Sequence, residues 1–213
     1  KALTEGLSAL SGKGPGGGPS YLDQIASGTD GSFSGIQSRA LDELDRALRS
    51  ETDFRTVVNG SLNTVVGAEN LILSLMACYQ GKLASPTLTS LERTTAQNRI
   101  NQASSTIAAQ VNPLRQNLTS EINSSNLNTA RLTILRDEAS RAVNATELDP
   151  PLQEYRRLQQ NALIHDVAEV FDAQQRGRDI TSQMDSLNQT TRAQINECRD
   201  FPNIPAPGAG GPN

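Results

Sequence analysis

The stretch Ile100–Ile122, INQASSTIAAQVNPLRQNLTSEI, decides the fold. Its apolar residues recur at steps of three and four, which places them on one stripe of an α-helix. The residues between them are mostly Asn, Gln, Ser and Thr, so the outer face is polar but carries little charge. The average step is nearer to an eleven-residue period than to a heptad, which predicts a nearly straight or slightly right-handed seam. The stripe consists of Ile100, Ala103, Ile107, Val111, Leu114, Leu118 and Ile122.

This stripe lies within a helix-compatible stretch, Thr87–Ala145, that runs between Pro86 and the pair Pro150-Pro151. Similar apolar spacing predicts a first helix over about residues 36–84 and a last helix over about residues 152–199. The sequence therefore predicts an all-α fold, an elongated up-down-up three-helix bundle over residues 36–201. Outside it lie a Gly/Pro-rich N-terminal arm with a short helix (residues 1–35) and a Pro/Gly-rich C-terminal tail (residues 202–213).

Several positions within the predicted helices favour kinks or ends. Gly60 weakens the first helix, and Pro113 removes a backbone donor from the central one, so a bend is expected at each. The run Asn123–Asn126 is a further weak point. Asp149 is the expected N-cap of the last helix, with a proline at its first position.

The apolar residues of the three helices form the predicted core. In the first helix they are Leu41, Leu44, Leu48, Val58, Leu62, Val65, Ile72, Leu75 and Tyr79. The central helix continues its stripe with Leu127, Ala130, Ile134, Leu135, Ala139, Ala142 and Val143. The last helix uses Leu152, Tyr155, Leu158, Ala162, Val167, Val170 and Phe171, followed by Ile180, Met184, Leu187, Thr191 and Ile195.

The composition excludes some classes of partner. Of 213 residues, 36% are hydrophobic and only 3% aromatic, which suits thin helical layers better than a thick globular core. The net charge is −4 and the basic residues are scattered, so a nucleic-acid surface is not expected. No run of 18 apolar residues occurs, and we therefore predict no membrane span.

The two cysteines test the predicted topology. Cys78 lies near the end of the first helix and Cys198 near the end of the last, and an up-down-up bundle places both ends at the same pole. Counting residues from the turns puts them within about one and a half helical turns of each other. We therefore predict a disulfide, which requires an oxidising compartment; the alternative is two free buried thiols in a cytosolic protein.

Five Asn-x-Ser/Thr tripeptides agree with a secreted eukaryotic glycoprotein. Their asparagines are the candidate glycosylation sites, although a chain this rich in Asn, Ser and Thr contains about three such tripeptides by chance. The candidates are Asn59, Asn117, Asn123, Asn144 and Asn188.

The sequence contains little that resembles a catalytic or metal site. His165 is the only histidine, and its closest constellation is Glu169 and Asp172, one and two turns further along the same predicted helix. A surface salt bridge or solvated face is the favoured interpretation, because di-iron bundles need Glu-x-x-His pairs on two helices. We predict no enzyme activity, no cofactor, no metal and no catalytic residue.

A polar, mostly uncharged helical rod with Gly/Pro-rich arms favours a structural role over an enzymatic one. We predict an extracellular or cell-surface structural subunit of a filament, pilus-like appendage, sheath or surface layer. Its expected partner is a copy of itself or another surface protein. The alternative is a helical binding module, such as an ectodomain, a periplasmic adaptor or a secreted effector, that presents one helix face to a protein partner.

Overall fold

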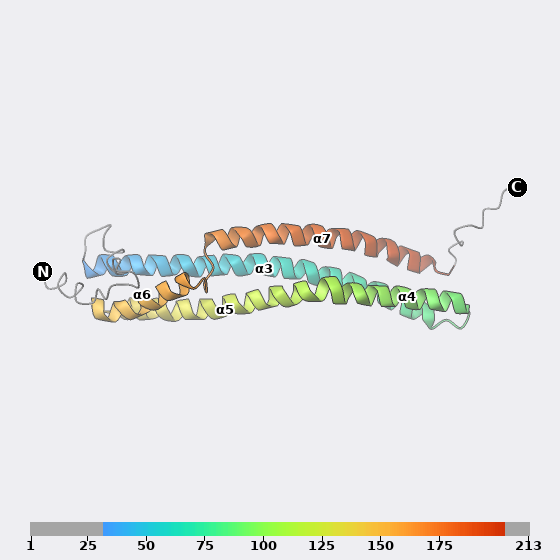
Figure 1. Cartoon of the computed structure of the whole chain (residues 1–213), viewed down its shortest axis with the longest axis horizontal. Helices are drawn as coiled ribbons and strands as arrows, with labels where there is room; N and C mark the ends of the chain where they lie inside the picture. The colour runs from blue at the N-terminus through green and yellow to red at the C-terminus, as the bar shows by residue number, and fades with distance from the viewer. Residues whose placement is uncertain (1–31, 203–213) are drawn as a thin grey trace. The chain divides into compact units, whose positions relative to one another are not determined.

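The structure is a computed structural model that describes residues 32–202, and all regular secondary structure in that range is helical. The elements are α3 (Phe33–Leu83), α4 (Ser90–Thr106), a π-helical turn η1 (Ile107–Val111), α5 (Asn112–Arg141), α6 (Ala145–Gln160) and α7 (Val167–Asp200) (Figure 1). The predicted all-α class is confirmed. Apart from the first residues of α3 and Pro202, the predicted N-terminal arm and C-terminal tail lie outside the described residues.

The first and central predicted helices exist close to their expected bounds. α3 is unbroken through Gly60, where a kink was expected. The central stretch is helical from Ser90 to Arg141, and Asn123–Asn126 does not interrupt it. Pro113 is accommodated by η1, in which the amide of Asn112 donates to the carbonyl of Ile107, five residues earlier. A π turn is a common way to re-route the hydrogen bonds that a proline disturbs.

The predicted last helix is wrong in one important respect, because it is two helices. α6 ends at Gln160, and the connection 161–166 follows before α7 begins. Ala162 adopts a positive φ of 48°, while its amide donates to Gln159 and the amide of Leu163 donates to Leu158. This is the Schellman arrangement, which glycine usually makes. Because Ala162 is not glycine, the helix end is not evident from residue type.

In a capping box, an N-cap side chain and a glutamate three residues later satisfy each other's backbone amides. α4 has Thr89 with Glu92. α6 begins after Asn144, whose side chain accepts from the amide of Glu147. The predicted N-cap Asp149 is therefore wrong, and Pro150 lies inside α6. The early start of α6 is explained by this cap.

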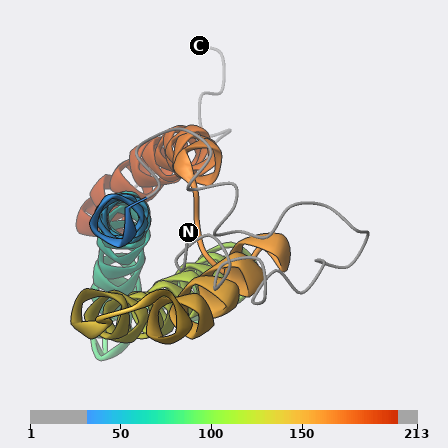
Figure 2. The same ribbon diagram turned by 90° about the vertical axis from the view of Figure 1, so that its left-hand side faces the viewer.

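The described part of the chain divides into two compact units, residues 32–57 with 121–173, and residues 58–120 with 174–202. We call them unit 1 and unit 2. In unit 1, α6 runs alongside the C-terminal part of α5, and both pack on the first part of α3 (Figures 1 and 2). The core of unit 1 consists of Ile36, Ala40, Leu44, Ala47, Leu132, Leu135, Ala139, Ala142, Leu148, Leu152, Tyr155, Leu158 and Ile164.

Unit 2 contains the second part of α3, α4 with η1 and the start of α5, and most of α7. Its buried apolar residues come from all of these segments, and they include Ile100, Ala103, Val111 and Leu118 of the predicted stripe. They are Val58, Val65, Ala68, Ile72, Leu75, Tyr79, Leu88, Ala96, Ile100, Ala103, Val111, Leu118, Met184, Cys198 and Phe201.

The predicted stripes are wrong in two places, both in unit 1. On α5, Leu127, Ala130 and Ile134 are exposed, because the steps of three and four that end at Ile122 continue through polar residues and not through these three. Near the start of α7, Val167 and Phe171 are also exposed, because the break after α6 resets the helical phase. Two other residues of the predicted stripes are exposed: Ala162, which lies in the connection, and Val143, which lies beyond α5.

One feature of α3 bears on the membrane prediction. By length and composition alone, α3 contains an 18-residue window that is apolar enough to cross a membrane, and 28% of that window is buried. Core helices of soluble proteins pass the same test. The absence of a membrane span therefore stays a prediction.

Candidate functional site

A buried carboxylate in unit 1 is the most unusual chemical feature of the described residues. Glu51 of α3 is fully buried. Its Oε1 accepts hydrogen bonds from the backbone amide of His165 at 2.8 Å and from Nδ2 of Asn128 at 3.2 Å. Its Oε2 accepts from Oγ of Ser125 at 2.7 Å and lies 3.0 Å from Nδ1 of His165. A buried charge is tolerated only when it is paired and hydrogen-bonded in this way.

The ring of His165 is held on two sides. Phe54, almost one turn after Glu51 on α3, stacks on the imidazole with ring centroids 3.6 Å apart and planes 8° from parallel. Glu51 holds the Nδ1 edge of the ring. Both contacts come from α3, so they fasten the α6–α7 connection to that helix. The side chain of His165 keeps only 19% exposure.

The electrostatics of the pair favour the ionised forms of both groups. Burial raises the pKa of the Glu51 carboxyl, but hydrogen bonds from His165 and Ser125 and the charge of His165 lower it more, so the net pKa is below the ordinary value. Burial lowers the pKa of His165, but the hydrogen bond and charge of Glu51, followed by the charges of Glu169 and Glu121, raise it more. Its net pKa is above the ordinary value. The pair therefore behaves as a buried salt bridge.

This cluster fits a structural fastener better than a catalytic triad. Ser125 is fully buried and donates to the carboxylate instead of to the histidine, so its hydroxyl is neither activated nor reachable by a substrate. Residues 32–202 contain no group of three His, Cys, Asp or Glu side chains that could hold a metal ion.

The structure corrects the predicted surroundings of His165. It lies in the connection and not on a helix, and its partner is Glu51, 114 residues earlier. Glu169 instead forms the capping box of α7: its amide donates to Asp166 and its carboxylate accepts from the amide of Asp166. Asp172 is exposed.

Sequence reasoning missed Glu51, Ser125 and Asn128, although a signal was present. Steps of three and four from Ile122 lead through Ser125 and Asn128 to Leu132, so both polar residues occupy core positions of α5. Polar residues at core positions of facing helices are expected to satisfy one another.

An open pocket of about 550 Å³ lies beside the cluster in unit 1. Burial raises the pKa of Tyr155 in its wall to about 12, so this phenol stays protonated at neutral pH. The pocket lining carries both signs of charge, with three carboxylates against Arg46 and His165. It is lined by Glu43, Arg46, Ala47, Ser50, Tyr155, Gln159, Ala162, Ile164, His165, Asp166, Val167, Ala168 and Glu169.

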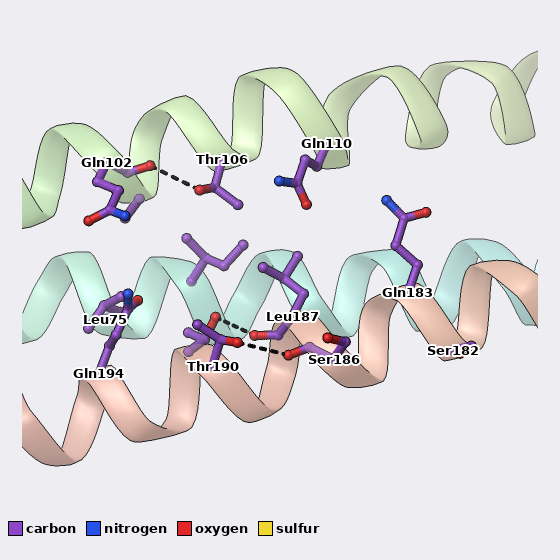
Figure 3. Close-up of a pocket in the computed structure, with 13 residues that line it drawn as sticks. Leu75, Gln102, Thr106, Gln110, Ser182, Gln183, Ser186, Leu187, Thr190 and Gln194 are labelled. Atoms are coloured by element: carbon purple, nitrogen blue, oxygen red, sulfur yellow. Dashed lines mark hydrogen bonds between the residues drawn. The ribbon is translucent and has the colours of Figure 1, made fainter.

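A second open groove of about 550 Å³ lies in unit 2 and has an uncharged lining. Figure 3 shows Gln102 and Gln110 on one side and Gln183 and Gln194 on the other, with Leu187 between them. Their amides make no side-chain hydrogen bond to the rest of the described chain, so they are available to a neutral polar ligand. The full lining is Ile72, Leu75, Gln102, Ala103, Thr106, Gln110, Ser182, Gln183, Ser186, Leu187, Thr190, Thr191 and Gln194.

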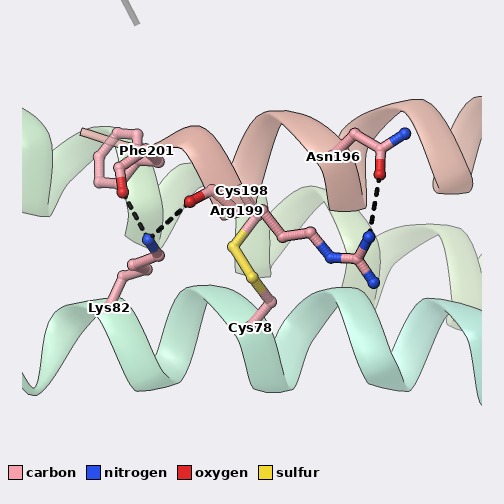
Figure 4. The surroundings of a disulfide bond; sticks show 6 residues. All are labelled: Cys78, Lys82, Asn196, Cys198, Arg199 and Phe201. Carbon is pink, nitrogen blue, oxygen red and sulfur yellow. Dashed lines mark hydrogen bonds between the residues drawn. A yellow bond between two sulfur atoms is a disulfide. The ribbon is translucent and has the colours of Figure 1, made fainter. Parts of the chain in front are cut away.

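The predicted disulfide is present in unit 2. Cys78 of α3 and Cys198 of α7 are bonded, with 6.4 Å between their Cα atoms (Figure 4). Beside it, Nζ of Lys82 donates to the carbonyls of Arg199 and Phe201, at 3.0 and 2.6 Å, and so caps the C-terminus of α7. The structure therefore supports the predicted bridge over two free thiols. A disulfide is weakly consistent with an oxidising compartment.

The five candidate glycosylation asparagines lie in different settings. Asn59, Asn117 and Asn123 are exposed on helices, and Asn144 is the exposed N-cap of α6. Asn188 is only partly exposed, and its Oδ1 is buried without a donor in the described part of the chain. Use of any of these sites stays a prediction.

Two exposed apolar faces complete the description of unit 1. The α5 face consists of Leu127, Ala130 and Ile134, on the side of α5 opposite its buried stripe; Leu127 is 62% and Ile134 57% exposed. The α7 face consists of Val167 and Phe171, one turn apart, at 76% and 61% exposure.

Comparison with known proteins supplies no relative. No protein-family model matches the chain, and neither the curated proteins nor the solved structures contain a match.

Proposed function

We propose that this chain is an extracytoplasmic structural subunit of a filament, pilus-like appendage, sheath or surface layer. The observation that carries the proposal is the exposed α7 face of unit 1. Contiguous apolar residues at a protein surface commonly mark contacts with other proteins. On the α7 face, Val167 and Phe171 lie within one turn of helix and are more than half exposed.

The disulfide supports the extracytoplasmic part of the proposal. Bridges such as Cys78–Cys198 form and persist in oxidising environments, whereas cytosolic thiols are usually kept reduced. In this proposal the elongated up-down-up bundle predicted from the sequence is the repeating body. The Gly/Pro-rich arms 1–35 and 202–213 are the segments available for docking.

The test of assembly is sedimentation velocity with electron microscopy of oxidised protein. We expect large, regular assemblies at micromolar concentration, and we expect Phe171→Glu to reduce them. Gln189→Glu is the matched control, because it adds the same charge to an exposed position of α7 that lies about 18 residues, or roughly 27 Å, beyond Phe171. A chain that stays monomeric or dimeric at every concentration would contradict the structural-subunit proposal.

The groove of unit 2 favours a second candidate, a helical binding module. Its glutamine amides and its leucine floor fit an uncharged polar partner, such as a peptide segment that offers backbone carbonyl and amide groups. A monomeric chain that captures one protein partner, and that loses capture on Gln183→Lys, would favour this candidate. Asp185→Lys, on the same helix but outside the groove lining, is the control.

A further inference from the structure

The α5 face has no partner within the described part of unit 1. Leu127, Ala130 and Ile134 lie at steps of three and four, so their side chains form one continuous ridge. This ridge spans eight residues, Leu127 to Ile134, or roughly 10 Å of helix. A self-complementary contact of this size is far below the roughly 1,000 Å² that a specific interface needs. A second copy seated on this face alone would therefore bind weakly, whereas a tethered segment of the same chain does not need a large area.

The chain contains a segment with the complementary pattern. Leu3, Leu7 and Leu10 lie at steps of four and three, the reverse of the steps on α5. If the two are placed antiparallel, Leu10 falls opposite Leu127, Leu7 opposite the small Ala130 and Leu3 opposite Ile134. A large side chain then faces the smallest one at the centre of the contact, as interdigitating ridges require.

The length of the tether fits the distance to be spanned. Gln37, near the start of α3, donates to the carbonyls of Ala139 and Ala142, so α3 begins level with the C-terminal end of α5. From Arg141, the last residue of α5, back to Leu127 is 14 residues of helix, or roughly 21 Å. Residues 11–31 are 21 residues rich in Gly and Ser, and chains of this length and composition have an average end-to-end distance of roughly 25 Å.

We infer that residues 1–10 dock through Leu3, Leu7 and Leu10 on the α5 face of their own chain. A tether whose typical length matches the span gives an effective concentration in the millimolar range, so even a weak contact is largely formed. The inference does not rest on the proposed function, since a monomeric binding module could hold the same contact. In a structural subunit, it leaves the α7 face and the C-terminal tail to contact neighbours.

The first measurement is hydrogen exchange of the full-length oxidised protein. We take an effective concentration of the tethered segment of about 1 mM and a dissociation constant for its contact with the α5 face of roughly 0.1 mM, which predicts that amide exchange over residues 2–10 slows about ten-fold. Ile134→Lys and Leu7→Glu should each abolish this protection. Phe171→Lys, which places the same charge on the α7 face, should leave it unchanged. Protection that survives Ile134→Lys, or no protection in the unsubstituted chain, would overturn the inference.

The second measurement identifies the occupant. A photo-cross-linking benzoylphenylalanine at position 7 should link to peptides of α5 around Ala130. In an equal mixture of isotopically heavy and light protein, a contact within one chain yields only heavy–heavy and light–light products. Mixed products would assign the face to the segment of a second copy, and links to the α7 face would show that the segment docks elsewhere. Either result contradicts the inference. Circular dichroism checks that each substituted chain is still folded.

Discussion

Replacement of Glu51 tests whether the buried cluster fastens the α6–α7 connection to α3. Glu51→Leu removes the acceptor from the amide of His165 and from Nδ2 of Asn128, whereas Ser125 keeps a second acceptor, the backbone carbonyl of residue 51, at 3.1 Å. Two buried donors left unsatisfied cost about 2–6 kcal/mol, which brackets the ~3–5 kcal/mol typical of a broken buried pair. We expect a loss of about 4 kcal/mol in the free energy of unfolding, or about 8–16 °C in melting temperature.

Glu51→Gln is the informative comparison. The amide oxygen can take the place of Oε1 and accept from Asn128 and the amide of His165. The NH₂ group then donates to Ser125 and to neutral Nδ1 of His165. All partners remain satisfied, so we expect a loss of only about 1–2 kcal/mol, the difference between charged and neutral hydrogen bonds.

The two variants should also differ from the unsubstituted protein in pH dependence. The folded pKa of Glu51 is below its ordinary value of 4.5, so its contribution is complete above pH 4.5 and is lost as the pH falls through the folded pKa. The folded pKa of His165 is above 6.5, so its contribution is complete below pH 6.5 and is lost as the pH rises through the folded pKa. The pair therefore stabilises the fold most between pH 4.5 and 6.5.

Urea unfolding followed by circular dichroism, from about pH 3 to pH 9, measures both effects. Glu51→Gln should remove most of the pH dependence on the acid side of the stability profile. It should also reduce the loss of stability that occurs on the alkaline side as His165 loses its proton. The reasoning is refuted if Glu51→Leu costs less than about 1 kcal/mol, or if Glu51→Gln has the same pH profile as the unsubstituted protein.

Five further substitutions, made in four variants, probe the backbone and the covalent link. Cys78→Ser with Cys198→Ser opens a loop of 120 residues and should lower the free energy of unfolding by about 4.9 kcal/mol in the chain-entropy model; equal stability in reducing and oxidising buffer would contradict the bridge. Gly60→Ala and Gly67→Ala should each raise the free energy of unfolding by about 1 kcal/mol, because an added Cβ meets no atom within 4 Å. A lower melting temperature for either variant would show that the added methyl group clashes with a neighbour. Ala162→Gly should raise the free energy of unfolding by about 1 kcal/mol, because glycine adopts a φ of 48° without strain. A lower free energy of unfolding would mean that this strain is absent.

The helical class and the disulfide followed from local pattern and chain length. The stripe Ile100–Ile122 predicted a helix because its apolar steps match the helical period, and every member from Ile100 to Ile122 is buried or partly buried. Cys78 and Cys198 were paired by counting residues between turns. The disulfide is present although the last predicted helix is broken into two.

The cluster around Glu51 was not predicted, because the assignment of apolar stripes considered only apolar residues. Ser125 and Asn128 occupy core positions of α5, and the stripe was therefore assigned to Leu127 and Ile134 instead. The break after α6 had one local sign, the capping box of Asp166 with Glu169, but no glycine or proline marks it.

The sequence by itself determined that the chain is helical, where its central helix lies and which cysteines pair, because these depend on residue period, on backbone propensity and on the length of chain between turns. Only the tertiary structure decided where the last predicted helix breaks and which polar residues are buried. The reason is that a buried carboxylate must find donors, and those of Glu51 come from α5 and from His165, which are 74 to 114 residues away along the chain.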